Sequence, residues 1–352
     1  AFTLAAVLHW LLQTKTGWLI ELGSLNNRAM IARLARDQAA PGLSDTWGEL
    51  DPHKRAVEAA QSVDLVLVNH SYVFARAKMD TDDGAPLDAI VFDEAHNIED
   101  GVTEALTQDF APWELQAEIS KLLDRTKEEK KITGPFRPLL EFEDLKHRPI
   151  VQNFAQALFD VENGIDEWCL LCSQRFSELR DQRYIETGED TYNEDPDNPV
   201  LFTNDRFWIP SLLQSAQKLL QQMGILKSVG DNLLEELPRL QGVPKRIQSS
   251  VSAFIQDIDE NVQSLQKILD FNDQDSVRWG EARVQADESG TPRLVSNAPV
   301  WEGVLHCTPL EVSTWLRNHL YPKYPHKIFV SATLAMGEKF ENILSKLGLT
   351  SE

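Results

Sequence analysis

The sequence is poor in cysteine and contains no long apolar segment. Only three of its 352 residues are cysteine. Its longest apolar runs, such as 65–68 and 168–172, are far shorter than the roughly 18 residues that span a bilayer, and its first residues lack the basic region of a signal peptide. We therefore expect a soluble, cytoplasmic protein with no membrane partner.

Cations are also scarce. Lys and Arg number 34 against 55 Asp and Glu, which gives a formal net charge of −21. Such a surplus of carboxylates opposes nucleic-acid binding over the whole surface. Much of the acidity, however, gathers in segments 186–197, 228–236 and 256–260. A DNA-binding groove lined locally by basic residues is therefore compatible with the negative net charge of the whole chain.

Two phosphate-binding motifs are missing. The sequence contains no G-x-x-x-x-G-K-[ST] loop, which would wrap the phosphates of a nucleotide, and no arginine-rich late motif that would supply an arginine finger. We expect this chain by itself to be inactive in phosphoryl transfer.

The most informative segment present is Asp93-Glu94-Ala95-His96, which follows the apolar residues 89–92. In motor ATPases, the first carboxylate of such a pair holds Mg²⁺, usually through water, and the second positions and deprotonates the attacking water. The alternative interpretation is a buried strand that leads into an acidic helix N-cap.

A second polar segment, Ser331-Ala332-Thr333, follows the apolar run 328–330. Small hydroxyl side chains at a strand end can hydrogen-bond catalytic carboxylates and a neighbouring domain. The alternative is a simple Ser/Thr cap of the next helix.

Local patterns predict an α/β fold. Apolar residues at helical spacing predict helices within 2–38, and Asp51 with Pro52 predicts a helix over 52–62. The nearly continuous apolar segments 63–68 and 88–92 predict the central parallel strands of a doubly wound sheet, with the carboxylates at its carboxyl edge.

The middle of the chain is predicted to be a helical insertion. Apolar residues recur at alternating spacings of four and three residues and form one apolar seam along a predicted helix. Such a seam needs a partner helix, and segment 212–223 is suitable. The seam residues are Val251, Ile255, Ile258, Val262, Leu265 and Leu269. Segments 276–284 and 294–296 are predicted to form a small hairpin after the insertion.

Taken together, segments 64–70, 91–97, 298–316 and 327–349 resemble the DinG/XPD-like branch of superfamily 2 DNA helicases. The resemblance implies part of a RecA-like doubly wound parallel sheet with a large inserted helical, arch-like domain. It divides the chain into part of the first motor lobe (1–104), the insertion (105–275) and a return to the motor lobe (276–352). The chain is expected to be an internal fragment of a longer helicase.

The resemblance also implies the activity and its partners. The parent enzyme would be an ATP-binding, Mg²⁺-dependent hydrolase that moves 5′ to 3′ on single-stranded DNA or a forked duplex. The insertion would offer a surface for a protein or ribonucleoprotein partner. The rival hypothesis is a non-catalytic DNA- or protein-interaction module built on a degenerate NTPase shell.

Individual roles follow from the same resemblance. Asp93 would hold Mg²⁺, Glu94 would act as base, and His96 would complete the catalytic set. Coupling of hydrolysis to DNA is assigned to Ser331, Ala332 and Thr333. The segment Asn69, His70 and Ser71 is a DNA-binding candidate by the resemblance. Cationic charge, with the stacking surface of Phe207-Trp208 in the first case, adds the candidates Arg206, Lys245 and Arg246. For the first three, a turn closed by its own hydrogen bonds is the alternative, and for the last three it is a solvated helix face.

Cysteine usage departs from the family pattern. Many relatives carry four cysteines that ligate an iron–sulfur cluster before the carboxylate motif. The corresponding stretch 23–60 has none, and Cys169 and Cys172 lie on one face of a predicted helix. We therefore expect no iron–sulfur cluster, and a cluster-less DinG-like branch.

Overall fold

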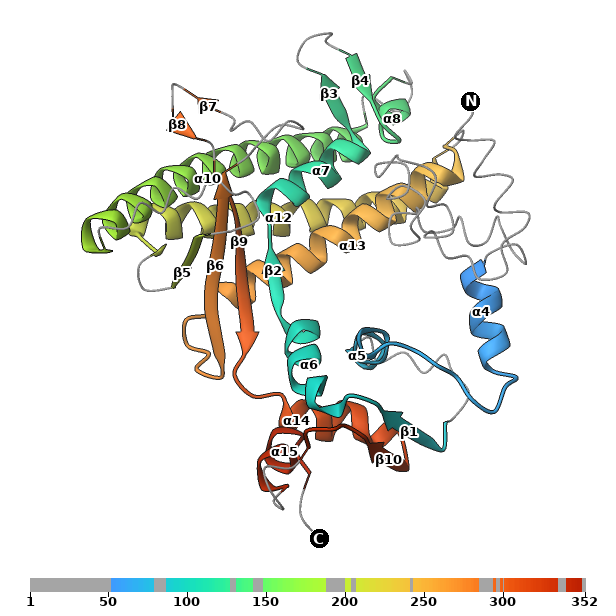
Figure 1. The fold of residues 1–352 in the computed structure, drawn as a ribbon. Helices are drawn as coiled ribbons and strands as arrows, with labels where there is room; N and C mark the ends of the chain where they lie inside the picture. Colours follow the sequence, from blue (N-terminus) through green and yellow to red (C-terminus); the bar gives the residue numbers. More distant parts are fainter. Residues whose placement is uncertain are drawn as a thin grey trace, which may run out of the picture. The chain divides into compact units, whose positions relative to one another are not determined.

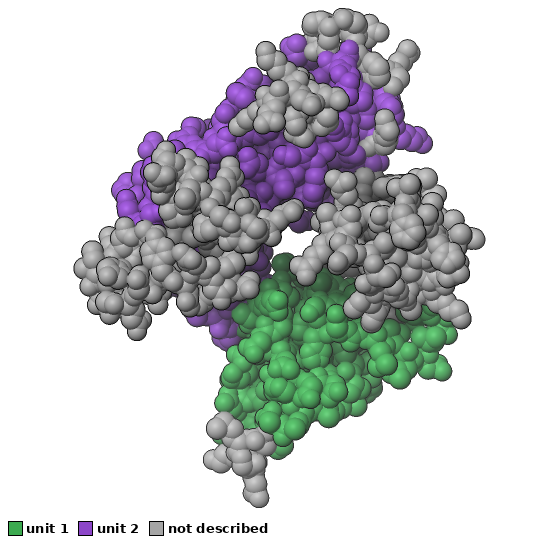
Figure 2. Space-filling view, turned by 45° about the horizontal axis from the view of Figure 1, so that its top comes forward, with its two compact units in different colours: residues 1–105, 312–352 green, residues 106–311 purple. Residues whose placement is uncertain are grey.

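The computed structural model describes residues 52–78, 87–126, 131–141, 148–187, 200–203, 207–240, 243–284, 294–295, 298–299, 301–334 and 340–349. The predicted helices within 2–38 lie outside these residues. The chain divides into two compact units, which Figure 2 colours separately. Unit 1 comprises residues 1–105 and 312–352, and unit 2 comprises residues 106–311. Within the described segments, no helix is both long and apolar enough to cross a membrane.

The described part of unit 1 contains two short strands and several short helices (Figure 1). The described elements are α4 (Pro52–Ala60), α5 (His70–Lys78), β1 (Ala89–Phe92), η4 (Ala95–Asn97), α6 (Ile98–Leu106), α14 (Ser313–Trp315), the π-helical turn η6 (Leu316–Leu320), η7 (Tyr321–Lys323), β10 (His326–Phe329) and α15 (Glu341–Lys346).

Strands β1 and β10 form a parallel pair, although they are more than 200 residues apart in sequence. Their register places Ala89 opposite His326 and Phe92 opposite Phe329. Three of the four residues of β1, and Ile328 and Phe329 in β10, are β-branched or aromatic and favour extended backbone. The structure thus confirms the strand predicted at 88–92 and the general α/β class. The doubly wound RecA-like sheet stays a prediction.

The strand predicted at 63–68 is absent. Residues 65–69 form no regular element, and the side chains of Leu65 and Leu67 are 76% and 88% exposed. A strand requires hydrogen bonds from a neighbouring strand, and the described part of the chain places none beside this segment. The apolar composition of this segment therefore did not make it a strand.

The helices of unit 1 begin and end with recognisable signals. Helix α4 starts at Pro52, as predicted, because proline suits the first helical turn. Helix α15 ends with Gly348 in the left-handed region (φ 66°). There, Leu349 N donates to Leu344 O (2.7 Å) and Gly348 N to Ser345 O (3.0 Å), which is the Schellman arrangement.

Unit 2 contains long helices and a larger sheet. Its elements are β2 (Gln108–Phe110), α7 (Pro112–Leu122), β3 (Asp124–Thr126), β4 (Lys131–Thr133), α8 (Arg137–Glu141), α10 (Pro149–Thr187), β5 (Val200–Thr203), α12 (Pro210–Glu236), η5 (Leu237–Arg239), α13 (Lys245–Ile268), β6 (Ser276–Val284), β7 (Leu294–Val295), β8 (Ala298–Pro299) and β9 (Trp301–Pro309).

Strands β2, β9, β6 and β5 form an antiparallel sheet in that order, and α10 and α13 pack against it (Figure 1). Helix α12 contacts both α10 and α13. The predicted seam of α13 is largely buried, with Val251, Ile258 and Leu265 fully enclosed. The structure therefore confirms that α13 has the partner helix its spacing requires.

The hairpin predicted from 276–284 and 294–296 is wrong. Strand β6 pairs instead with β9, over the full length from Ser276–Pro309 to Val284–Trp301, and β7 pairs only with β8. The longer strand offers nine register pairs against two. Because β6 and β9 belong to one sheet, unit 2 continues to Glu311, whereas the sequence analysis placed the return to the first lobe at 276.

Arg278 joins the sheet of unit 2 to the end of α13. Its buried guanidinium donates to the carbonyl oxygens of Ile268 (3.2 Å), Asp273 (2.9 Å) and Asp270, and it lies 3.6 Å from the Asp273 carboxylate. The Ile268 carbonyl belongs to the last turn of α13, where a helix leaves its acceptors unpaired, and the other two carbonyls lie in the segment that follows. Arg278 thus satisfies the helix terminus from inside the fold.

Candidate functional site

The carboxyl ends of β1 and β10 lie side by side and continue to hydrogen-bond after the strands end. Val330 N donates to Phe92 O (2.8 Å), and Ala95 N donates to Val330 O (2.9 Å). These two bonds fix the residues that follow β1 against the residues that follow β10. The two polar segments singled out in the sequence therefore meet at one edge of the parallel pair.

Glu94 has an unusual backbone. Its φ of 48° and ψ of 46° make it the only non-glycine residue with positive φ in the part of the chain that the structure describes. Its N–H donates to Asp93 Oδ1 (3.0 Å), and its side chain is 60% exposed. A left-handed conformation costs a residue with a Cβ on the order of 1–2 kcal/mol. Strain of this kind gathers at functional sites.

His96 connects the two segments. Its Nδ1 lies 2.7 Å from Ser331 Oγ and 3.3 Å from Glu94 Oε2. Glu94 and Ser331 thus both approach the same nitrogen of one imidazole ring. This contact joins residues 235 positions apart in the sequence.

The Ser331-Ala332-Thr333 turn is organised by its own hydroxyl groups. Thr333 N donates to Ser331 Oγ (3.3 Å), and the two hydroxyl oxygens are 3.5 Å apart. Ala332 is exposed between them. Ser331 therefore contacts both His96 and Thr333. A movement of His96 can shift Ser331 and, through it, Thr333.

The residues at 69–71 occupy the start of α5. Asn69 Oδ1 accepts a hydrogen bond from Tyr72 N (2.9 Å), which makes Asn69 the N-cap of α5 and agrees with the alternative of a closed turn. Ser71 is exposed. The His70 ring packs edge-on against Phe92, at 5.7 Å between ring centroids. This contact between His70 and Phe92 was not predicted, and its one signal in the sequence is a histidine that follows an apolar segment.

The donor set at the β1 edge fits a magnesium ion. Mg²⁺ retains several waters and usually takes only one or two protein carboxylates. Asp93 is exposed, and its Oδ1 accepts the hydrogen bond from Glu94 N. Asp93 would hold the ion, and Glu94 would stand next to it. Over the described ranges, no group of three or more His, Cys, Asp or Glu side chains could enclose a metal by itself.

The other DNA-binding candidates belong to the segment assigned to unit 2. Arg206 lies outside the described residues. Lys245 is exposed at the first position of α13, and Arg246 follows it in the same helix. Phe207 is fully buried and stacks on Phe176 (5.4 Å, 21°), so its ring is not available to stack on a base.

The Cys169 and Cys172 pair lies within α10. Cys172 is buried in the core of unit 2, and Cys169 packs against that core. Burial raises the pKa of Cys169 to about 12 and also raises the pKa of Cys172. Thiols with raised pKa values are poor metal ligands and poor nucleophiles. Their surroundings match two small core residues.

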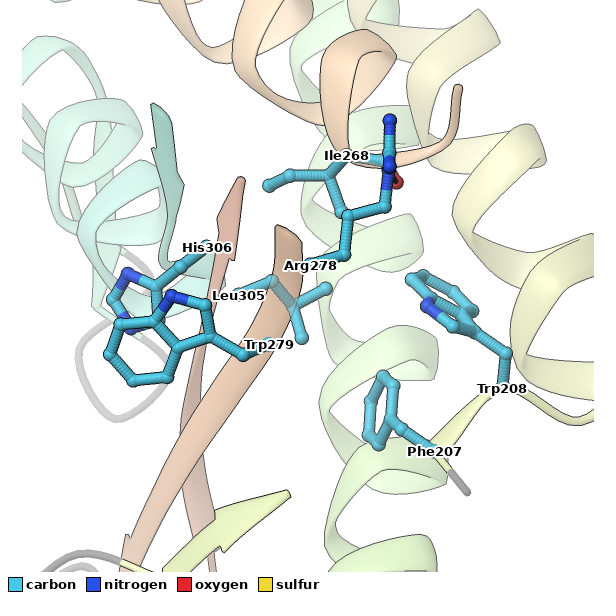
Figure 3. A pocket seen from close by; sticks show the side chains of 7 residues that line it. All are labelled: Phe207, Trp208, Ile268, Arg278, Trp279, Leu305 and His306. Atoms are coloured by element: carbon cyan, nitrogen blue, oxygen red, sulfur yellow. Dashed lines mark hydrogen bonds between the residues drawn. The ribbon is translucent and has the colours of Figure 1, made fainter. Parts of the chain in front are cut away.

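The cavities found in unit 2 give no competing site. One measures about 10 Å³, lies near Arg278 and Leu305, and has room for one water molecule at most. Figure 3 shows it, with the Trp279 ring flat against that of His306 at a centroid distance of 4.0 Å. A more open one of about 350 Å³ is lined in part by Lys267 and Ser276, which both bind Asp273.

Comparison with known proteins gives one similarity. No family model matches the sequence. The chain is similar to the 3′-5′ exonuclease DinG of Bacillus subtilis (strain 168), with 23% identity over 365 residues. The match covers 99% of this chain and 35% of that protein. The chain thus spans about a third of the length of the curated relative it matches.

Proposed function

We propose that this chain carries part of the ATP-hydrolysing motor of a DinG-like helicase that acts on DNA. The observation that supports this most directly is the contact of His96 with both Glu94 and Ser331. An acidic N-cap that arose by chance would explain segment 93–96, and a hydroxyl cap that arose by chance would explain segment 331–333. Neither explains why the two share one imidazole ring at the end of a parallel strand pair.

In the proposed mechanism, the carboxylates have separate roles. Bound MgATP supplies the phosphoryl group and a metal ion that neutralises its charge. Asp93 holds the ion, and Glu94 orients a water molecule and accepts its proton. The Glu94 side chain is 60% exposed, so a water molecule can reach its carboxylate.

His96 and Ser331 would report the state of this site. When Glu94 changes partner during hydrolysis, His96 can move with it, and Ser331 follows through its 2.7 Å contact. Ser331 and Thr333 would transmit the change to the DNA-binding parts of the enzyme. The insertion, with Lys245 and Arg246, would contact single-stranded DNA or a protein or ribonucleoprotein partner.

The proposal assigns to this chain a part in ATP hydrolysis and not the exonuclease activity named for the relative. Nucleases often use two metal ions held by several carboxylates. The described residues bring together no such group. Movement in the 5′ to 3′ direction, and the absence of an iron–sulfur cluster, are carried forward as parts of the proposal.

The test uses the full-length gene product. Glu94→Gln keeps the size of the side chain but removes the base, so ATP hydrolysis should fall on the order of 100-fold or more while nucleotide binding survives. Asp93→Asn removes the charge that faces the metal and should weaken Mg²⁺-dependent ATP binding instead. Wild-type hydrolysis by Glu94→Gln would refute the motor assignment.

A second pair of variants examines coupling. Ser331→Ala with Thr333→Ala should lower the rate of duplex unwinding more than the rate of ATP hydrolysis, because the hydroxyls do not contact the attacking water. Equal loss of both rates would place the hydroxyls in the chemical step. The rival, a non-catalytic binding module, predicts DNA binding without hydrolysis in the wild type and in every variant.

A further inference from the structure

An aromatic stack lies directly beneath the candidate site. Phe92, the last residue of β1, is buried between Phe74 and Phe329, with centroid distances of 6.3 and 5.5 Å and nearly parallel rings. The His70 ring meets Phe92 edge-on at 5.7 Å and Phe74 at 5.9 Å. Every ring of this group comes from unit 1.

The position of Phe92 determines where the site begins. Its carbonyl accepts the bond from Val330 N (2.8 Å), and its peptide unit leads directly to Asp93. A shift of the Phe92 ring would therefore move the carboxylate segment and the hydroxyl segment together. Catalytic geometry tolerates little displacement, since about 1 Å can cost on the order of 100-fold in rate.

His70 has little freedom to leave this ring. It is the first residue of α5, and the Asn69 cap fixes the start of that helix. The same helix is pressed against α6, where a Cβ on Gly101 would lie 2.9 Å from the Phe74 ring. The imidazole thus fills the space beside Phe92.

We propose that His70 is a positioning residue, which seats Phe92 and thereby places Asp93 for metal binding. The inference rests on the proposed function, since it assigns the metal to Asp93. It differs from the role in DNA contact that the sequence pattern suggested for His70.

The test measures metal affinity and does not depend on turnover. Mn²⁺ binding by the full-length gene product with a non-hydrolysable ATP analogue is followed by electron paramagnetic resonance. His70→Ala should weaken Mn²⁺ binding about 10-fold, the loss typical of residues that orient a metal ligand. His70→Phe keeps a ring against Phe92 and should restore the affinity to within about twofold of the wild type.

His319→Ala is the matched control. The His319 ring also packs on an aromatic side chain of unit 1, Trp315, at 5.6 Å. Its loss should leave Mn²⁺ affinity unchanged. Equal Mn²⁺ affinity in His70→Ala and the wild type would overturn the proposal, as would a loss of DNA affinity in both His70 variants with Mn²⁺ binding intact.

The remaining outcomes are also decisive. If His70→Ala and the ring-free His70→Gln both fail to fold, His70 has a purely structural role and the proposal is overturned. If the wild type binds no Mn²⁺ with the analogue, the proposed function fails first. If the wild type binds normally and Glu94→Gln stops hydrolysis, a normal His70→Ala refutes the positioning role alone.

Discussion

Units 1 and 2 use their polar residues differently. In unit 2, the buried guanidinium of Arg278 satisfies the carbonyls at the end of α13. In unit 1, Asp93, Glu94 and His96 are exposed at the end of a two-stranded sheet, and Glu94 has a strained backbone. Polar groups that complete a fold are explained by stability. Exposed, strained groups that the fold does not need are better explained by function.

The largest expected effect concerns the independence of unit 2. Residues 106–311 expressed alone should fold cooperatively, because their helices and sheet share one core and because β2 and β9, near its two ends, pair with each other. Urea unfolding followed by circular dichroism would measure this. Non-cooperative unfolding would mean that unit 2 needs unit 1 in order to fold. The polar residues of the two units could then not be compared as parts of independent folds.

Arg278→Met should lower the free energy of unfolding by about 3 kcal/mol, because it leaves several buried carbonyls and the Asp273 carboxylate without their donor. Arg239→Met is the control, since Arg239 is exposed and pairs only with Glu236 one turn earlier. That change should cost less than about 0.5 kcal/mol. Similar losses in chemical denaturation would show that Arg278 is not special.

A smaller, pH-dependent effect is expected at Asp257 in α13. Burial, with Glu118 and Glu260 nearby, raises the pKa of Asp257 to about 6. Between about pH 4 and 6 the folded protein keeps this proton while the unfolded chain has lost it, so stability falls as the pH rises through that window.

Asp257→Asn should therefore stabilise the protein at pH 7 by about 1 kcal/mol, after allowance for solvent screening of a half-exposed group. Near pH 4 the variant and the wild type should be equally stable. Urea unfolding at both pH values checks this. A gain of the same size at pH 4 would show that the charge of Asp257 is not the cause.

The smallest effect tests strain in unit 1. Glu94→Gly relieves the left-handed backbone but increases the entropy of the unfolded chain, so a net gain of about 0.5 kcal/mol is expected. Hydrolysis should be lost at the same time. Glu104→Gly, within helix α6, should instead destabilise the protein by about 1 kcal/mol. If Glu94→Gly and Glu104→Gly both destabilise the protein, the backbone of Glu94 is not strained.

The sequence predicted the elements whose signal is local. The strand at 88–92 and the seam of α13 follow from side-chain type and spacing. Partners distant in sequence were not predictable in the same way. The segment 63–68, expected to be a strand, has no neighbouring strand among the described residues, and 276–284 paired with the longer strand β9. His96 and Ser331 lie next to each other because of the register between β1 and β10. This register could not be predicted from the sequence of either strand alone.

The most direct test of a single ATP site at the ends of β1 and β10 is a crystal structure of the full-length Glu94→Gln protein with MgATP. It should show the metal ion within one water molecule of the Asp93 carboxylate, and the γ-phosphate facing the turn at Ser331. Nucleotide bound elsewhere, or no bound nucleotide at millimolar MgATP, would contradict the account.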